Sequence, residues 1–186
     1  MLETHRRAPA GPARRRGRSA PALRPDQSND ATPANETDEL TAAVAAFPTH
    51  RFGEVEVPVT IARALERMGY VEPTEVQARS IPVLQAGRDL IAQAQTGTGK
   101  TAAFGIPIVQ RIDPSNRRVQ ALVLTPTREL CVQVTDEIAR LGQFRNVRPV
   151  AIYGGASMDR QIRGLADGAQ VVVGTPGRVL DLIRRR

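Results

Sequence analysis

Tryptophan is absent from the sequence, and aromatic residues make up only 3% of its 186 positions. A core of this composition must be aliphatic, which favours a parallel sheet covered by helices over an aromatic-rich β-sandwich. The single cysteine, Cys131, excludes a disulfide within the chain and a zinc site built from cysteines. It fits a reducing compartment, so we expect a cytoplasmic protein. No apolar run approaches the roughly 20 residues that a membrane-spanning helix needs, so we expect no membrane segment.

Lysine is almost absent as well. It occurs once, as Lys100, among 26 basic residues, and it lies in the segment Ala94-Gln95-Thr96-Gly97-Thr98-Gly99-Lys100-Thr101. Arginine presents a rigid planar fork, whereas lysine is a compact charge on a flexible stem. Because a loop wrapped around a phosphate has room for lysine and not for arginine, this exception indicates a site for nucleotide phosphates.

The net charge of +7 points towards polyanionic partners, and the charge is unevenly distributed. Residues 1–48 show neither helical nor strand periodicity, so we expect a disordered Arg/Pro-rich tail there and one folded domain over residues 49–186. The arginine cluster at residues 14–18 could hold RNA through its phosphates or could simply keep the tail soluble. The sequence leaves both interpretations open.

Apolar strands and amphipathic helices alternate after residue 49. We expect strands over residues 89–94, 119–125, 147–153 and 169–174, and helices over residues 61–68, 74–84, 100–111, 130–141, 158–165 and 176–186. This alternation predicts a parallel sheet with right-handed crossovers, in which ligands bind at the carboxyl ends of the strands. The expected fold class is therefore α/β.

The glycine-rich segment has the pattern of a phosphate-binding loop between a strand and a helix. Gly97 and Gly99 would let several backbone N–H groups face one anion at the start of the helix. Lys100 would reach the outer phosphates of a nucleotide, and the Thr101 hydroxyl would bind Mg²⁺, so these two are the candidate catalytic residues. An ordinary glycine-rich turn is the alternative.

Five segments in this order resemble the first RecA-like domain of a DEAD-box RNA helicase. They are Gly69–Gln77 with the isolated aromatic Phe52 upstream (Q motif), Ala94–Thr101 (motif I), Pro126–Leu130 (motif Ia), the doublet Gly154-Gly155, and Thr175–Arg178 (motif Ib). The resemblance covers about residues 50–186. It implies a P-loop NTPase fold of the RecA-like type, in which the parallel sheet is incomplete.

The resemblance implies ATP as the cofactor, bound with Mg²⁺. The nucleotide would contact Phe52, Gln77, Ala94, Gln95, Thr96, Gly97, Thr98, Gly99, Lys100 and Thr101. The amide of Gln77 carries a donor and an acceptor, which match N6 and N7 of adenine and not the two acceptors of guanine. Phe52 would stack on the base. The alternatives are a solvated glutamine on a surface helix and a phenylalanine buried in the core.

The resemblance also implies RNA as a partner, held along its phosphate backbone. The expected contacts come from Pro126, Thr127, Arg128, Gly154, Gly155, Thr175, Pro176, Gly177 and Arg178. Hydroxyls and N–H groups at helix starts, and forked guanidinium groups, suit phosphate oxygens. Such binding should be independent of base sequence and weakened by salt. The alternatives are a plain helix start, a plain turn, and a local ion pair between Arg128 and Glu129.

The Asp-Glu-Ala-Asp segment that gives this family its name does not occur in the 186 residues. Neither the family's Ser-Ala-Thr motif nor its second RecA-like domain is present. We therefore expect the intact protein to be an ATP-dependent RNA helicase and the given chain to hydrolyse ATP negligibly, because phosphoryl transfer needs several groups at once. A catalytically inactive truncation product that binds nucleotide or RNA is the alternative. Which proteins, if any, bind the chain is not encoded in a motif that the sequence shows.

Overall fold

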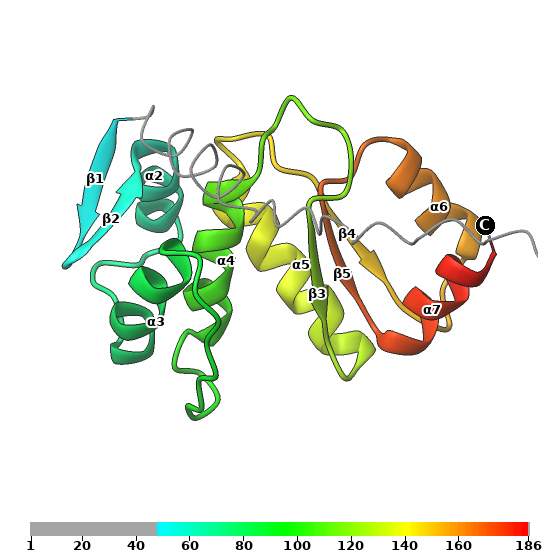
Figure 1. The fold of residues 1–186 in the computed structure, drawn as a ribbon, viewed down its shortest axis with the longest axis horizontal. Coiled ribbons are helices and arrows are strands. Elements are labelled where there is room, and N and C mark those ends of the chain that lie inside the picture. Colours follow the sequence, from blue (N-terminus) through cyan, green and yellow to red (C-terminus); the bar gives the residue numbers. More distant parts are fainter. Residues whose placement is uncertain (1–47, 186) are drawn as a thin grey trace, which may run out of the picture. The chain divides into compact units, whose positions relative to one another are not determined.

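A hairpin and three helices come first, and short strands then alternate with helices from residue 121 onward (Figure 1). The structure is a computed structural model that describes residues 48–185. These residues belong to one unit, Pro33–Arg186. The elements are β1 (Thr49–Phe52), β2 (Val55–Pro58), α2 (Val59–Arg67), α3 (Glu75–Gln85), α4 (Lys100–Arg111), β3 (Ala121–Leu124), α5 (Arg128–Gly142), β4 (Pro149–Ile152), α6 (Met158–Ala166), β5 (Val171–Gly174) and α7 (Pro176–Arg184). The tail predicted over residues 1–48 lies outside the described residues, apart from Pro48.

The three later strands form a parallel sheet in the order β3–β5–β4, which confirms the expected α/β class. All four residues of the central strand β5 are buried. Figure 1 shows α5 on one side of this sheet and α6 and α7 on the other. The ladder continues past the strand ends, because the Thr125 N–H donates to the Gly174 carbonyl and the Thr175 N–H donates to the Ile152 carbonyl, both at 2.9 Å.

The strand predicted over residues 89–94 is wrong. Residues 88–95 have no regular secondary structure, and no described strand pairs with them. The side chain of Ile91 in this segment is fully exposed. A strand depends on a neighbour that supplies its ladder of hydrogen bonds, and an apolar sequence does not create that neighbour.

A short antiparallel hairpin precedes the helices, and the sequence interpretation missed it. Phe52 pairs with Val55 across the turn formed by Gly53 and Glu54. The strands have four residues each, which is too short for their alternation to stand out. The later helices agree better with expectation. In particular, α4 begins at Lys100 and ends at Arg111, as predicted.

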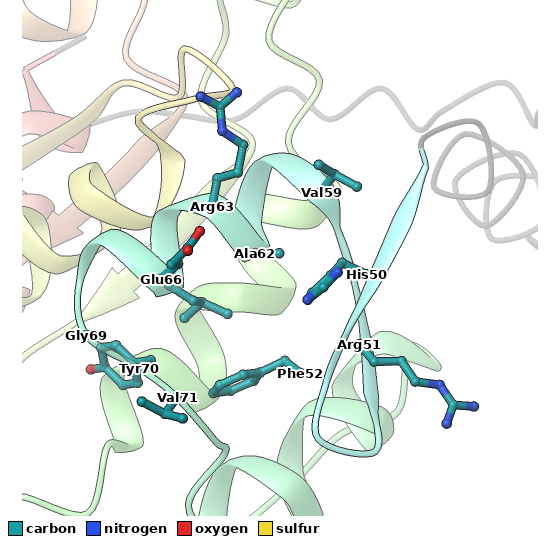
Figure 2. Close-up of a pocket in the computed structure, with 11 residues that line it drawn as sticks. His50, Arg51, Phe52, Val59, Ala62, Arg63, Glu66, Gly69, Tyr70 and Val71 are labelled. Carbon is teal, nitrogen blue, oxygen red and sulfur yellow. The ribbon is translucent and has the colours of Figure 1, made fainter.

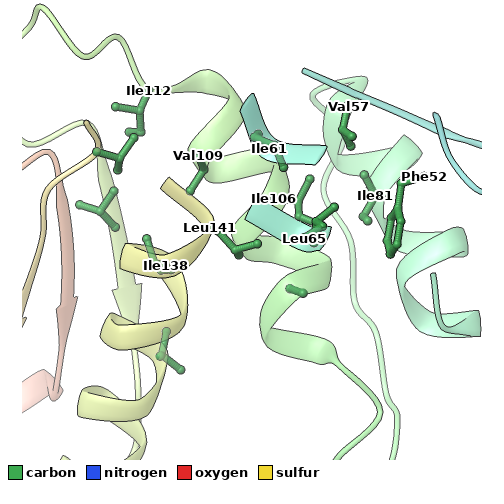
Figure 3. Close-up of a cluster of buried hydrophobic side chains, with 14 of the residues drawn as sticks. Phe52, Val57, Ile61, Leu65, Ile81, Ile106, Val109, Ile112, Ile138 and Leu141 are labelled. Atoms are coloured by element: carbon green, nitrogen blue, oxygen red, sulfur yellow. The ribbon is translucent and has the colours of Figure 1, made fainter. Parts of the chain in front are cut away.

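The aliphatic core lies between α2, α4 and α5 (Figure 3). Ile138 and Leu141 of α5 face Ile106 of α4, and the buried Ile61 and Leu65 of α2 belong to the same cluster. Within residues 48–185, Phe52 is the one aromatic side chain that is fully buried, as the low aromatic content predicts. No helix in this range is long and apolar enough to cross a bilayer.

Candidate functional site

The glycine-rich loop meets the amino-terminal end of α4. Gly97 and Gly99 both adopt left-handed backbone conformations, with φ of 81° and 83°, and Gly99 is the N-cap of α4. The Thr98 hydroxyl donates to the Gln95 carbonyl at 2.8 Å and tightens the turn. The first N–H groups of α4 have no partner within the helix, so the loop points them and the positive end of the helix dipole at one place.

Lys100 is the first residue of α4, and its side chain folds back across the loop. Its ammonium donates to the carbonyls of Ala94 and Gln95, the second at 2.7 Å. Both bonds join a half-buried ammonium to backbone carbonyls of the glycine-rich loop. An anion placed in the loop would offer the ammonium a stronger, charge-assisted partner.

The start of α3 is bonded to the glycine-rich loop. The Gln77 amide donates to the Gly99 carbonyl at 3.1 Å, and its oxygen accepts from the Thr74 N–H at 3.0 Å. The Thr74 hydroxyl donates to the Thr98 carbonyl at 2.8 Å. A Cβ added at Gly99 would lie 2.2 Å from the Gln77 amide nitrogen, so a side chain there would displace that amide. The segment that resembles the Q motif is therefore hydrogen-bonded to the glycine-rich loop.

Gln77 is completely buried, so the alternative of a solvated surface glutamine is wrong. Both ends of its amide are bonded within the protein, to Thr74 and Gly99. A contact between Gln77 and adenine would require the amide to give up at least one of these bonds. That contact stays a prediction.

Phe52 lies in the core, with 5% of its surface exposed. Its ring lines a pocket of about 430 Å³ between β1, α2 and residues 69–71 (Figure 2). A separate groove of about 860 Å³ lies between α3 and residues 90–98, beside the glycine-rich loop, and it shares no lining residue with the first pocket. The burial of Phe52 favours the buried-core alternative, and stacking on a base stays a prediction.

Three further loops leave the carboxyl ends of β3, β4 and β5 at one edge of the sheet. Together with the first turns of α5 and α7, which follow two of them, these loops contain Pro126–Arg128, Gly154-Gly155 and Thr175–Arg178. The following side chains and glycines are exposed: Pro126, Thr127, Arg128, Gly154, Gly155, Pro176 and Gly177. The structure therefore brings the residues predicted to bind RNA together on one accessible edge, as parallel pairing requires.

Contacts between side chains link these loops. The Arg128 guanidinium lies 5.0 Å from the centre of the Tyr153 ring, a cation–π contact. The Arg178 guanidinium donates to the Ala156 carbonyl at 3.1 Å and to the Gln161 amide oxygen at 3.3 Å. Within the described residues no ion pair joins Arg128 to Glu129, so that alternative is wrong. The half-buried Arg178 therefore connects the start of α7 to the loop after β4 and to α6.

The threonines of these loops have different roles. Thr127 is the N-cap of α5, and its hydroxyl oxygen accepts from the Leu130 N–H at 3.2 Å, which leaves the hydroxyl hydrogen free to donate. Thr175 precedes Pro176 at the start of α7 and makes no side-chain cap. Both threonines therefore stand at the start of a helix, as the plain helix-start alternative expects. A helix start of this kind can still bind an anion through its free N–H groups.

The sequence interpretation missed Tyr153 and Gln161. Tyr153 directly precedes the glycine doublet, and Gln161 is a polar residue at an inward position of α6. A polar side chain where helical periodicity predicts an apolar one was the available signal. Cys131 is buried in α5. Burial raises the pKa of its thiol, which donates to the Val173 carbonyl, and both features disfavour the reactive thiolate.

The comparisons with known proteins agree on a single family. The family model described as DEAD/DEAH box helicase matches residues 74–186. The chain is 50% identical over 136 residues to the ATP-dependent RNA helicase CshA of Listeria monocytogenes, covering 73% of this chain and 26% of that protein. It is 51% identical over 134 residues to the DEAD-box ATP-dependent RNA helicase CshA of Geobacillus kaustophilus, covering 72% of this chain and 29% of that protein. The chain thus spans about a quarter of the length of these relatives.

Solved structures show the same similarity. A DEAD box protein from the hyperthermophile Methanococcus jannaschii matches with a TM-score of 0.68 and 41% identity, over 74% of this chain and 38% of that one. Dbp5 of S. cerevisiae, bound to RNA and ADP BeF3, matches with a TM-score of 0.63 and 36% identity. The match covers 69% of this chain and 32% of the Dbp5 chain.

Proposed function

Because the chain belongs to the DEAD/DEAH box helicase family, we propose that it forms the ATP-binding part of an ATP-dependent RNA helicase. The observation that carries this proposal is the glycine-rich loop at the start of α4, bonded to the start of α3. The curated relatives are named as ATP-dependent RNA helicases, and this chain spans about a quarter of their length. The proposal therefore concerns the activity of the longer protein.

In this proposal the outer phosphates of ATP bind at the start of α4. The residues Ala94, Gln95, Thr96, Gly97, Thr98 and Gly99 form the loop, and Lys100 exchanges its bonds to loop carbonyls for the phosphates. The helix dipole and the free N–H groups favour that anion. The solved relative bound to ADP BeF3 supports a nucleotide in a protein of this fold.

Adenine recognition by Gln77 deepens the proposal. The amide would leave the Gly99 carbonyl and present its donor and acceptor to N7 and N6 of adenine. Nucleotide binding would then release one of the bonds that tie α3 to the loop. We keep Phe52 as a proposed neighbour of the base, although 5% exposure requires its ring to move before it stacks.

The fit of Mg²⁺ is partial. Thr101 lies half-buried in the first turn of α4 and offers one hydroxyl. In residues 48–185 no group of three or more His, Cys, Asp or Glu side chains could hold a metal ion. Mg²⁺ commonly takes one or two protein ligands together with phosphates and waters. Thr101 would therefore be one ligand of an ion bound with the nucleotide, where the metal neutralises phosphate charge.

We further propose that the three loops at the carboxyl edge of the sheet bind the RNA backbone. The exposed Arg128 and the hydroxyls and N–H groups at the starts of α5 and α7 suit phosphate oxygens. The same face carries Gly154, Gly155 and Gly177, where no side chain blocks the approach of a strand. Affinity should not depend on base sequence. We place the protein in the cytoplasm on the strength of its single, free cysteine.

The alternative is a product that binds nucleotide or RNA and catalyses nothing. Lys100 and Thr101 position phosphates, whereas hydrolysis also needs a group that orients the attacking water. The described residues include no acidic cluster beside the loop. The proposal therefore assigns binding to this chain and the complete reaction to the longer protein.

Competition between ATP and GTP tests this function. We expect ATP to displace a fluorescent ATP analogue from the chain at least about tenfold better than GTP, since a mismatched donor and acceptor leaves polar groups unpaired. Gln77→Leu should bring the two nucleotides to similar affinities, and Gln133→Leu, at an exposed position of α5, should preserve the preference. Equal displacement by ATP and GTP from the unmodified chain would refute adenine recognition.

A further inference from the structure

Helix α6 carries one buried side chain, and it is polar. Gln161 has 5% of its surface exposed, whereas its apolar neighbour on the helix, Ile162, is 46% exposed. Burying an amide is unfavourable unless its hydrogen bonds are replaced. The position of Gln161 therefore calls for an explanation that packing alone does not supply.

Both ends of the Gln161 amide are bonded to the loops at the carboxyl edge of the sheet. Its nitrogen donates to the Tyr153 carbonyl at 2.9 Å, directly before the glycine doublet. Its oxygen accepts from the Arg178 guanidinium at 3.3 Å, and the same guanidinium nitrogen donates to the Ala156 carbonyl at 3.1 Å. One side chain thus fixes the loop after β4 at its start and ties it to the loop after β5.

The connection extends to the third loop through Tyr153. The Arg128 guanidinium lies over the ring of this tyrosine at 5.0 Å. Arg128, Tyr153, Gln161 and Arg178 therefore form a continuous series of contacts across all three loops. Bonds in such a series reinforce one another when every polar group is satisfied.

We propose that Gln161 is a positioning residue for RNA binding. It sets the spacing between the Gly154-Gly155 loop and the Thr175–Arg178 loop, so that their N–H groups and guanidinium groups match successive phosphates of one strand. Gln161 touches no RNA itself in this scheme, because it is buried. The inference rests on the proposed RNA-binding function of these loops.

The test compares RNA and nucleotide binding in the full chain. Gln161→Met keeps the length of the side chain and removes both hydrogen bonds. We expect about tenfold weaker binding of a fluorescein-labelled single-stranded oligo(U) RNA by anisotropy, with MgATP affinity unchanged by calorimetry. Gln161→Glu retains an acceptor for Arg178 and loses the donor to Tyr153, so its loss should be smaller. Gln133→Met, at an exposed site, should bind RNA as the unmodified chain does.

The outcomes separate the two proposals. Absence of RNA binding by the unmodified chain would overturn the proposed RNA function and this inference with it. RNA binding that Gln161→Met leaves intact would overturn the inference alone. A parallel fall of RNA and MgATP affinity, or unfolding of both Gln161 variants in a thermal melt, would show a purely structural role and also overturn it.

Discussion

At the scale of single residues, Gly99 carries the strictest requirement in the molecule. Its φ of 83° is unfavourable for any other residue, and its missing side chain leaves space for the Gln77 amide. Gly97 shares the left-handed backbone, with φ of 81°, but no atom lies within 4 Å of the place where its Cβ would be. A substitution at Gly97 therefore introduces backbone strain alone, whereas one at Gly99 adds a steric contact with Gln77.

Alanine substitutions at the two glycines should differ in cost. We expect Gly97→Ala to lower the free energy of unfolding by about 1–2 kcal/mol through backbone strain alone. Gly99→Ala should lower it by about 1 kcal/mol more, because the methyl group displaces Gln77 and breaks its bond to the Gly99 carbonyl. Urea unfolding followed by circular dichroism measures both. Equal losses would show that the bond from Gln77 contributes nothing to stability.

The sequence indicated several of these residues and left others hidden. The sequence singled out Gln77 as part of a local motif, and the structure places it in the first turn of α3 with its amide bonded to Gly99. The partners of Gln77 and the roles of Tyr153 and Gln161 depend on how loops from different strands meet. Such contacts join residues distant along the chain, and no periodicity in a single sequence encodes them.

At the scale of elements, helices were predicted well and strands less so. The apolar period and capping residues of α4 and α5 define each helix locally. Residues 89–94 have the composition of a strand, but a strand also requires a partner, and none of the described strands provides one. The same dependence leaves β3 with one paired edge and one free edge. Leu122 on β3 is 53% exposed and Leu124 is 55% exposed.

The free edge of β3 should promote self-association. An exposed apolar edge strand pairs readily with another chain, and a charge on it opposes that pairing. We expect sedimentation velocity to show oligomers that increase with protein concentration, and Leu122→Glu to reduce them. Ile162→Glu is the matched control, because Ile162 is similarly exposed, at 46%, but lies on a helix. An equal reduction by both variants would attribute association to general hydrophobicity and not to the edge.

At the scale of the whole molecule, the described residues contain two proposed binding regions. The starts of α3 and α4 form the proposed ATP site, and the loops after β3, β4 and β5 form the proposed RNA site. The one lysine of the sequence is the first residue of the helix that follows the glycine-rich loop.

The central claim is that this loop binds the phosphates of ATP, and calorimetric titration with MgATP tests it most directly. We predict measurable binding to the unmodified chain, no measurable binding to Lys100→Ala, and unchanged binding to Arg118→Ala, which removes one charge from an exposed loop. A Lys100→Ala chain that is folded and binds MgATP with unchanged affinity would contradict the account.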